Sequence, residues 1–237
     1  MSVRAEPVNA RAPANVALDG EILRQALDRL LQHYDVERWH WTPATPAFDI
    51  CSGAILVQHT AWTNVEKALS NLRAAGVDSP KALRVVQDSE LASLVRPAGT
   101  PVVKARRLKA FAGLVANQGG FDGLFDRPVA DLRTLLVSTN GIGPETADVI
   151  LLYAARQPVI VHDAYTARLC RRLGIGPERD SYDAWRTWLD ELLPRDLSYR
   201  QRAHAAIVVH CKATCRVTPR CSECPIVDIC EFASAVS

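Results

Sequence analysis

The sequence has no long apolar run, and this absence excludes a membrane-spanning helix, which needs about 20 consecutive apolar residues. The first 20 residues also lack the apolar core of a signal peptide, so we expect a cytoplasmic protein with a frayed leader. Internal repeats and low-complexity segments are absent too. With 48% hydrophobic and 23% charged residues, the chain is neither disordered nor collagen-like, and it can bury a sizeable core.

The spacing of apolar residues predicts almost no β-strand. Only residues 158–161 resemble a strand, and they are too few and too isolated to form a sheet. The pattern predicts a first helix over 19–34, capped by Asp19, and a long helix from about residue 50 to Gly76. Further helices are expected at 80–86, 88–95, 104–117, 129–137, 145–155, 164–173, 181–193 and 198–210. The sequence therefore predicts an all-α protein, and its 237 residues favour two joined lobes.

Charge gives little guidance to a partner, because the net charge is only +2. Two groups of basic residues stand out, and each fits a solvated helix face as well as it fits a polyanion site. They are Lys104, Arg106, Arg107 and Lys109 in the middle of the chain, and Lys212, Arg216 and Arg220 near its end.

Cysteine is concentrated at the C-terminus, where five of the seven lie in the last 27 residues. In a reducing compartment such a group more often binds metal than forms disulfides. The four candidate ligands are separated by five, two and five residues: Cys215, Cys221, Cys224 and Cys230. Four thiolates so spaced can hold one iron–sulfur cluster or one zinc ion, and spacing alone does not choose between them. Cys51 and Cys170 lie in apolar helical patterns, so we expect them in the core.

A glycine turn joins two short apolar stripes within residues 131–154. Asn140-Gly141-Ile142-Gly143 separates the two stripes, so the pattern predicts a helix, a sharp turn and a second helix. Glycines let the backbone approach a ligand, and the N–H groups that begin the second helix suit a phosphate. Taken alone, the pattern favours an ordinary αα-corner.

Gly141-Ile142-Gly143, followed by Glu145-Thr146-Ala147-Asp148, resembles the helix-hairpin-helix of the endonuclease III superfamily of base-excision DNA glycosylases. The resemblance implies that Gly141 and Gly143 contact the DNA backbone without reading its sequence. Family members that also nick the strand carry a lysine where this chain has Glu145. Because glutamate cannot form the Schiff base that β-elimination requires, the resemblance implies a monofunctional glycosylase.

Asp163 follows the apolar segment 159–161 and precedes a helical pattern, which makes it the expected N-cap of that helix. A capping carboxylate stays ionised beside the positive end of a helix. The resemblance assigns Asp163 to the family's catalytic aspartate, which stabilises an oxocarbenium-like sugar and orients the attacking water. His162 beside it is expected to point elsewhere.

The same resemblance assigns a [4Fe–4S] cluster to Cys215, Cys221, Cys224 and Cys230, with His210 in matching register ahead of them. The family usually has six residues between the first two ligands, one more than here, so Cys211 is held in reserve for Cys215. Arg216 and Arg220 lie in the loop closed by the first two ligands and are the implied phosphate contacts. In this role the cluster shapes a DNA-binding loop and performs no redox chemistry on the substrate.

Gln58 interrupts an apolar helix, and by itself it fits a satisfied core amide or a helix-end cap. The segment through Trp62, Asn64 and Glu66 is most similar to the 3-methyladenine branch of the family. In that branch a glutamine at this place enters the space left by the flipped nucleotide. The resemblance therefore implies a DNA contact for Gln58.

Trp39, Trp41 and Pro43 precede that helix in a loop, and together with Trp62 they form the base pocket that the resemblance implies. Stacking a positively charged alkylated purine on tryptophan adds about 0.5–2 kcal/mol of cation–π attraction over the normal base. The alternative is that the tryptophans fill the seam between the lobes. The segment 96–99 resembles the family's hairpin near the opened base pair, although Thr100 follows where an aromatic residue is frequent.

The resemblance covers about residues 20–231. It implies a six-helix barrel with the hairpin over 40–157 and an iron–sulfur cluster domain formed by 1–39 and 158–237. We expect a monomer that binds double-stranded DNA containing a damaged base in the cleft between the two domains, with no membrane partner. Asp163 and a water then hydrolyse the N-glycosidic bond of a flipped alkylated purine, leaving an abasic site in an intact strand.

Three alternatives stay open. The first is a DNA-binding or damage-sensing module that has lost useful catalysis. The second is a bifunctional endonuclease III-like glycosylase and AP lyase that acts on oxidised pyrimidines. The third is a helical DNA-binding protein stabilised by zinc.

Overall fold

The computed structural model describes residues 16–236, and these residues form helices and turns but no strand. The expected all-α fold is therefore confirmed, and the strand-like segment 158–161 forms no strand. Most of the expected leader, residues 1–15, lies outside the described residues. Between residues 16 and 236, no helix is both long and apolar enough to cross a bilayer.

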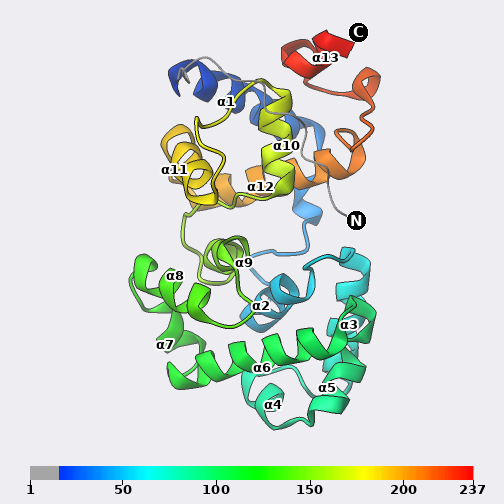
Figure 1. Cartoon of the computed structure of the whole chain (residues 1–237), viewed down its shortest axis with the longest axis vertical. Coiled ribbons are helices and arrows are strands. Elements are labelled where there is room, and N and C mark those ends of the chain that lie inside the picture. The colour runs from blue at the N-terminus through cyan, green and yellow to red at the C-terminus, as the bar shows by residue number, and fades with distance from the viewer. Residues whose placement is uncertain (1–15, 237) are drawn as a thin grey trace. The chain divides into compact units, whose positions relative to one another are not determined.

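The helices belong to two compact units, one of residues 39–161 and one that joins the N-terminal segment up to Arg38 to the segment from His162 onward. The expected barrel boundaries, 40 and 157, and the roles assigned to the two domains stay predictions. The helices of the 39–161 unit are α2 (Ala47–Leu56), α3 (Trp62–Ala74), α4 (Pro80–Val85), α5 (Asp88–Leu94), α6 (Pro101–Asn117), α7 (Phe121–Phe125), α8 (Val129–Ser138) and α9 (Pro144–Val149) (Figure 1). A π-helical turn, Ile150–Ala154, extends α9. Helix α6 packs against α4, α5 and α2, and this packing buries Leu56, Leu83 and Leu108 completely.

The single helix expected from residue 50 to Gly76 is wrong, because α2 ends at Leu56 and α3 begins at Trp62. His59 adopts a left-handed conformation, with φ 58°, through which a right-handed helix cannot continue. Lys104 of α6 stabilises the end of α2, where its Nζ donates to the carbonyls of Leu56 at 2.8 Å and Gln58 at 2.9 Å. Lys104 is only 2% exposed, so it supports the fold and is not part of a basic surface.

The other unit contains α1 (Val16–His33), α10 (Ala164–Arg172), α11 (Tyr182–Leu192), α12 (Leu197–Ala213) and α13 (Glu231–Val236). Helix α12 packs against α1 and α10. Asp19 was expected to cap the first helix, but α1 begins at Val16, so Asp19 lies buried within its first turn. The cause is local, since Ala17 and Leu18 favour helix and extend it upstream of Asp19. Cys51 and Cys170 are fully buried, which confirms their expected place in the core.

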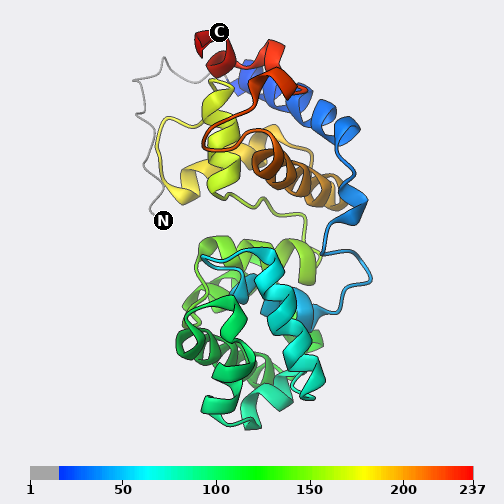
Figure 2. The same ribbon diagram turned by 90° about the vertical axis from the view of Figure 1, so that its right-hand side faces the viewer.

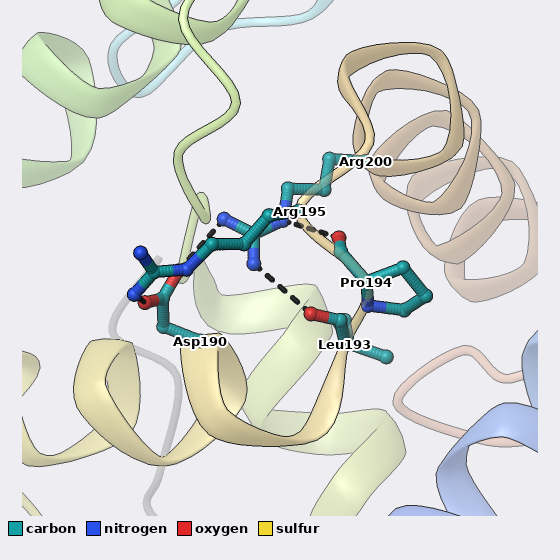
Figure 3. A network of polar contacts seen from close by, with 5 residues as sticks. All are labelled: Asp190, Leu193, Pro194, Arg195 and Arg200. Atoms are coloured by element: carbon teal, nitrogen blue, oxygen red, sulfur yellow. Dashed lines mark hydrogen bonds and ion pairs between the residues drawn. The ribbon is translucent and has the colours of Figure 1, made fainter.

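A buried arginine fixes the tight turn between α11 and α12 (Figure 3). The guanidinium of Arg200 forms an ion pair with Asp190 at 2.7 Å and donates to the carbonyls of Pro194 at 2.7 Å and Leu193 at 3.0 Å. Arg195 approaches the other oxygen of Asp190 at 2.6 Å. Burial alone would raise the pKa of Asp190, but the two arginines outweigh it and hold that pKa below its usual value. The turn therefore sets the position of α12, which carries two of the histidines considered below.

Candidate active site and cysteine loop

Asp163 is the N-cap of α10, as the sequence predicted. Its Oδ1 accepts hydrogen bonds from the backbone N–H of Thr166 at 2.7 Å and from the Thr166 hydroxyl at 2.8 Å. Its Oδ2 lies 3.7 Å from Nε2 of His204 on α12, and the side chain is 11% exposed. Burial would raise the pKa of Asp163, but His204 and Thr166 outweigh it and hold the pKa below 3.8. Asp163 is therefore a fixed carboxylate that stays ionised at neutral pH.

The histidines around Asp163 have different positions. His162 stacks on Trp185 of α11, with ring centroids 4.8 Å apart, so its side chain points away from Asp163 as expected. Burial lowers the pKa of His162 to about 4, so its ring is neutral at pH 7. His204 is buried and faces the carboxylate. No motif marks His204 in the sequence, because it is one of many residues in a long helix and follows Asp163 by 41 positions.

Gly141 and Gly143 form the turn between α8 and α9. Gly141 has φ +87°, and a Cβ built on it would lie 2.1 Å from Cγ of Arg107, so only glycine fits there. Gly143 is exposed and is the N-cap of α9. Glu145 is exposed in the first turn of α9, where a negative charge is favourable. The turn is thus open at Gly143 and Glu145 and closely covered by Arg107 at Gly141.

Gln58 follows α2 and contacts this turn. Its Nε2 donates to the carbonyl of Gly141 at 3.0 Å and to the hydroxyl of Thr146 at 3.0 Å. Its Oε1 accepts a hydrogen bond from Arg107. The structure thus brings together Gln58 and Gly141, two of the residues for which the family resemblance implies DNA contacts.

Three of the four residues assigned to the base pocket lie in one aromatic cluster. Trp41 meets Trp62 edge-on at 5.5 Å and packs on Tyr153 at 5.0 Å. The His40 ring is stacked on Trp62, with centroids 3.6 Å apart, and is tilted by 34° against Trp39 at 3.9 Å, so it contacts both indoles. The remaining residue, Pro43, is exposed in the loop that carries these residues.

The backbone of α2 supports this cluster from one side. A Cβ built on Gly53 would lie 3.1 Å from the Trp62 ring and 3.5 Å from Nε1 of Trp41. The Trp62 indole also donates to Glu66 at 3.0 Å. Trp62 is therefore held in place by α2 and by its own helix, and the sequence missed the contributions of His40 and Tyr153.

The segment 96–99, expected near an opened base pair, forms a 3-10 turn at Arg96–Ala98 followed by Gly99 with φ 79°. Thr100 is left-handed, with φ 41°, and α6 begins at the next residue. The first turn of α6 exposes Val102 and Val103, which are 57% and 42% accessible. An apolar surface therefore follows Thr100, where the sequence lacks the frequent aromatic residue.

The four candidate ligands line one cavity, together with His210 and Arg172: Cys215, Cys221, Cys224 and Cys230. Figure 2 shows the loop after α12 lying beside α1, and Arg29 of α1 pairs with Asp228 of the loop at 2.6 Å. Cys211 does not line this cavity; its thiol lies 3.5 Å from the carbonyl of Tyr165 and also contacts the Cys215 thiol. No three His, Cys, Asp or Glu side chains in the described part of the chain are arranged around a single-ion site.

Arg172, at the end of α10, organises the beginning of the cysteine loop. It donates to Sγ of Cys215 at 3.2 Å and to the carbonyls of Arg216 at 2.7 Å and Val217 at 3.2 Å. Its guanidinium also lies 4.7 Å from the ring centroid of Phe232. Cys211 lowers the pKa of the Cys215 thiol, and Arg172 acts in the same direction against burial. The donor set of four thiols around one cavity, with a cation at one sulfur, fits a thiolate-bound cluster.

Arg216 and Arg220 are both exposed on this loop. Arg220 lies 3.9 Å from Glu223, a contact between exposed side chains that contributes little to stability. Both guanidinium groups are thus accessible to a large anionic ligand.

Comparison with known proteins places this chain in a family. A model described as "HhH-GPD superfamily base excision DNA repair protein" matches residues 52–195. A Methanocaldococcus jannaschii protein, assigned provisionally as a DNA repair glycosylase, is 39% identical over 213 residues, which are 89% of this chain and 96% of the relative.

Solved structures agree with this match. H. pylori 3-methyladenine DNA glycosylase bound to 1,N6-ethenoadenine is 29% identical, with a TM-score of 0.68 over 82% of this chain and 97% of that one. A trapped endonuclease III–DNA covalent intermediate is 20% identical, with a TM-score of 0.76 over 92% of this chain and 98% of that one, and it shows a shared fold.

The fold, the hairpin and the capped aspartate define a base-excision repair DNA glycosylase. The chain belongs to the HhH-GPD superfamily of base excision DNA repair proteins, which confirms the resemblance stated from its motifs.

Proposed function

We propose that the protein is a monofunctional DNA glycosylase that removes an alkylated purine from double-stranded DNA. The observation that carries the proposal is Asp163, an ionised carboxylate held by Thr166 and His204 at the start of α10. The preference for an alkylated purine is supported by the similarity to the H. pylori 3-methyladenine DNA glycosylase, which is 29% identical. We also propose that the protein acts as a monomer in the cytoplasm, at the nucleoid when bound to DNA.

Asp163 acts on a water molecule and on the sugar. Water attacks C1′ while the N-glycosidic bond breaks, and the base leaves with the bonding electron pair. A purine made cationic by alkylation leaves as a neutral base, so it needs no proton from the enzyme. The carboxylate stabilises the positive sugar and accepts a proton from the attacking water.

Strand cleavage by β-elimination requires an amine that forms a Schiff base with C1′ of the sugar. Glu145 occupies the position of the lysine that supplies this amine in the bifunctional members, and a carboxylate cannot replace it. The product is then an abasic site in an intact strand.

The aromatic cluster supports a preference for a cationic base. The His40 ring contacts both Trp39 and Trp62, and a flipped base that displaces this ring gains contact with the same two indoles. Such stacking favours a positively charged purine by about 0.5–2 kcal/mol. Trp41, 7% exposed, forms one edge of the pocket, and Pro43 extends its rim.

DNA is held by groups on both units. Gly141 and Gly143 present backbone to phosphates, and Gln58 enters the opened duplex. Arg216 and Arg220 contact phosphates from the cysteine loop. Cys215, Cys221, Cys224 and Cys230 hold a [4Fe–4S] cluster, which supplies a rigid centre for that loop and no redox step.

The test is incubation with duplexes that contain methylated purines, uracil or thymine glycol, followed by scoring strand breaks before and after hot alkali. We expect breaks only after alkali and only on methylated DNA. Breaks without alkali would show a bifunctional lyase, and strong activity on thymine glycol would identify the oxidised-pyrimidine alternative. Binding without base release would identify the DNA-binding module. Purified protein that contains zinc but no acid-labile sulfide would refute the assignment of an iron–sulfur cluster.

A further inference from the structure

The amide of Gln58 is bound on both of its sides. Its nitrogen donates to the Gly141 carbonyl and the Thr146 hydroxyl, each at 3.0 Å, and its oxygen accepts from the guanidinium of Arg107. An arginine side chain has only donors, and a backbone carbonyl is only an acceptor. Both sets of partners are therefore satisfied by one orientation of the Gln58 amide, in which its oxygen faces Arg107 and its nitrogen faces Gly141 and Thr146.

Arg107 reaches Gln58 by crossing the hairpin turn. A Cβ at Gly141 would lie 2.1 Å from Cγ and 2.5 Å from Cδ of Arg107, so the absent side chain leaves the room through which the arginine passes. One turn earlier on α6, Lys104 donates to the backbone carbonyl of Gln58 at 2.9 Å. Helix α6 thus holds the backbone of Gln58 with one cation and its side chain with another.

We propose that Arg107 is the positioning residue of Gln58, and that it makes Gln58 a hydrogen-bond donor toward the base left unpaired. This inference rests on the proposed function, in which Gln58 enters the opened duplex. On entry the amide nitrogen exchanges Gly141 and Thr146 for an acceptor on DNA, while the oxygen keeps its bond to Arg107. A pyrimidine opposite a lost purine offers such acceptors, the O2 of thymine or the O2 and N3 of cytosine.

The key variant is Arg107→Met, which keeps a long stem over Gly141 and removes every donor. The matched control is Arg106→Met, because Arg106 is the exposed neighbour on the same helix and loses the same charge. Single-turnover base release is measured on a methylated duplex, on the same strand without its complement, and on a duplex with an abasic analogue opposite the lesion. Circular dichroism and thermal melting establish that each variant is folded.

We expect Arg107→Met to slow release from the duplex about tenfold, the size expected for losing a hydrogen bond to a charged group. Combining it with Gln58→Ala should add no further loss. Arg106→Met should cost less than twofold, and Arg107→Lys, which retains donors, should restore most of the rate. On the single strand, and on the duplex with an abasic analogue opposite the lesion, Arg107→Met should release the base at the same rate as the unaltered protein.

Two results would overturn the inference. Equal losses in both methionine variants that vanish with added salt would make Arg107 a phosphate contact. Losses that multiply with Gln58→Ala would make the two residues independent. If the unaltered protein releases no base, the proposed function fails by itself. In that case the affinities of Arg107→Met, Gln58→Ala and the double variant are measured for a duplex with a tetrahydrofuran abasic site opposite thymine. The double variant should again lose no more affinity than either single variant.

Discussion

Asp163 has two roles in this structure, and substitution can separate them. As the N-cap of α10 its Oδ1 accepts two hydrogen bonds from Thr166. Asparagine keeps such an oxygen and caps helices as well as aspartate does, whereas alanine removes it at a cost of about 0.5–2 kcal/mol. We therefore expect Asp163→Asn to change the free energy of unfolding by less than about 1 kcal/mol, and Asp163→Ala to lower it by about 1 to 2 kcal/mol.

Base release should respond differently, because it needs the negative charge. Both variants should lose at least about 100-fold in single-turnover rate on methylated duplex DNA, the scale set by removing one preorganised electrostatic group. Affinity for a duplex with an abasic analogue should remain within about twofold, because the analogue lacks the positive charge on the sugar with which the carboxylate interacts, and Asp163 binds no phosphate.

A second capping aspartate gives the matched control. Asp196 caps α12 and accepts from the N–H of Tyr199 at 2.7 Å, and it is exposed. Asp196→Ala should cost about 1 kcal/mol of stability and leave base release unchanged. Equal effects of the two alanine variants on base release, or full activity in Asp163→Asn, would refute the catalytic role of Asp163.

The pH dependence of stability provides a further check on the same carboxylate. Because the folded protein holds the pKa of Asp163 below 3.8, ionisation contributes stability that is fully present above that value. The contribution is lost as pH falls through the lower folded value. The stability difference between the unaltered protein and Asp163→Asn should therefore shrink below about pH 4, as measured by urea denaturation.

Two further predictions concern the cysteine loop and the base pocket. Cys221→Ser should lose iron and sulfide and weaken DNA binding, whereas Cys211→Ser should retain both, as measured by metal and acid-labile sulfide analysis; equal losses would make Cys211 a ligand. His40→Ala should vacate the space that the His40 ring occupies against Trp39 and Trp62, and it should raise base release from duplexes with two different methylated purines by the same factor, since removing a competing occupant does not change a ratio. A change in that ratio would instead place His40 in contact with the base.

The helical fold was predictable because local signals agreed with it. Apolar residues recur at helical spacing, and Asp163 precedes its helix as a cap should. The break between α2 and α3 was not predictable, because apolar spacing continues across it. What ends α2 there is a left-handed His59 and the cation of Lys104, which is 46 residues away in sequence from the carbonyl of Gln58.

The site was predictable only where a motif is contiguous. Gly141 and Gly143 lie within one turn, and their neighbours in sequence identify them. Arg107 and His204 contact Gln58 and Asp163 from other helices, so their roles depend on packing that no short pattern encodes. Charged and polar residues are also common on helix surfaces, so the basic group that contains Arg107 indicated a solvated face or a polyanion site and no contact with Gln58, and nothing selected His204.

Three buried cations explain why net charge was a poor guide to a DNA partner. Lys104 binds carbonyls at the end of α2, Arg172 binds carbonyls of the cysteine loop, and Arg200 binds carbonyls before α12. Each cation satisfies backbone groups that irregular structure leaves without partners, and each is withdrawn from the surface. The charges that can meet phosphates are instead exposed ones such as Arg216 and Arg220. A sum over the sequence counts both kinds equally, so the position of each cation, and not the total of +2, determines whether it can bind a polyanion.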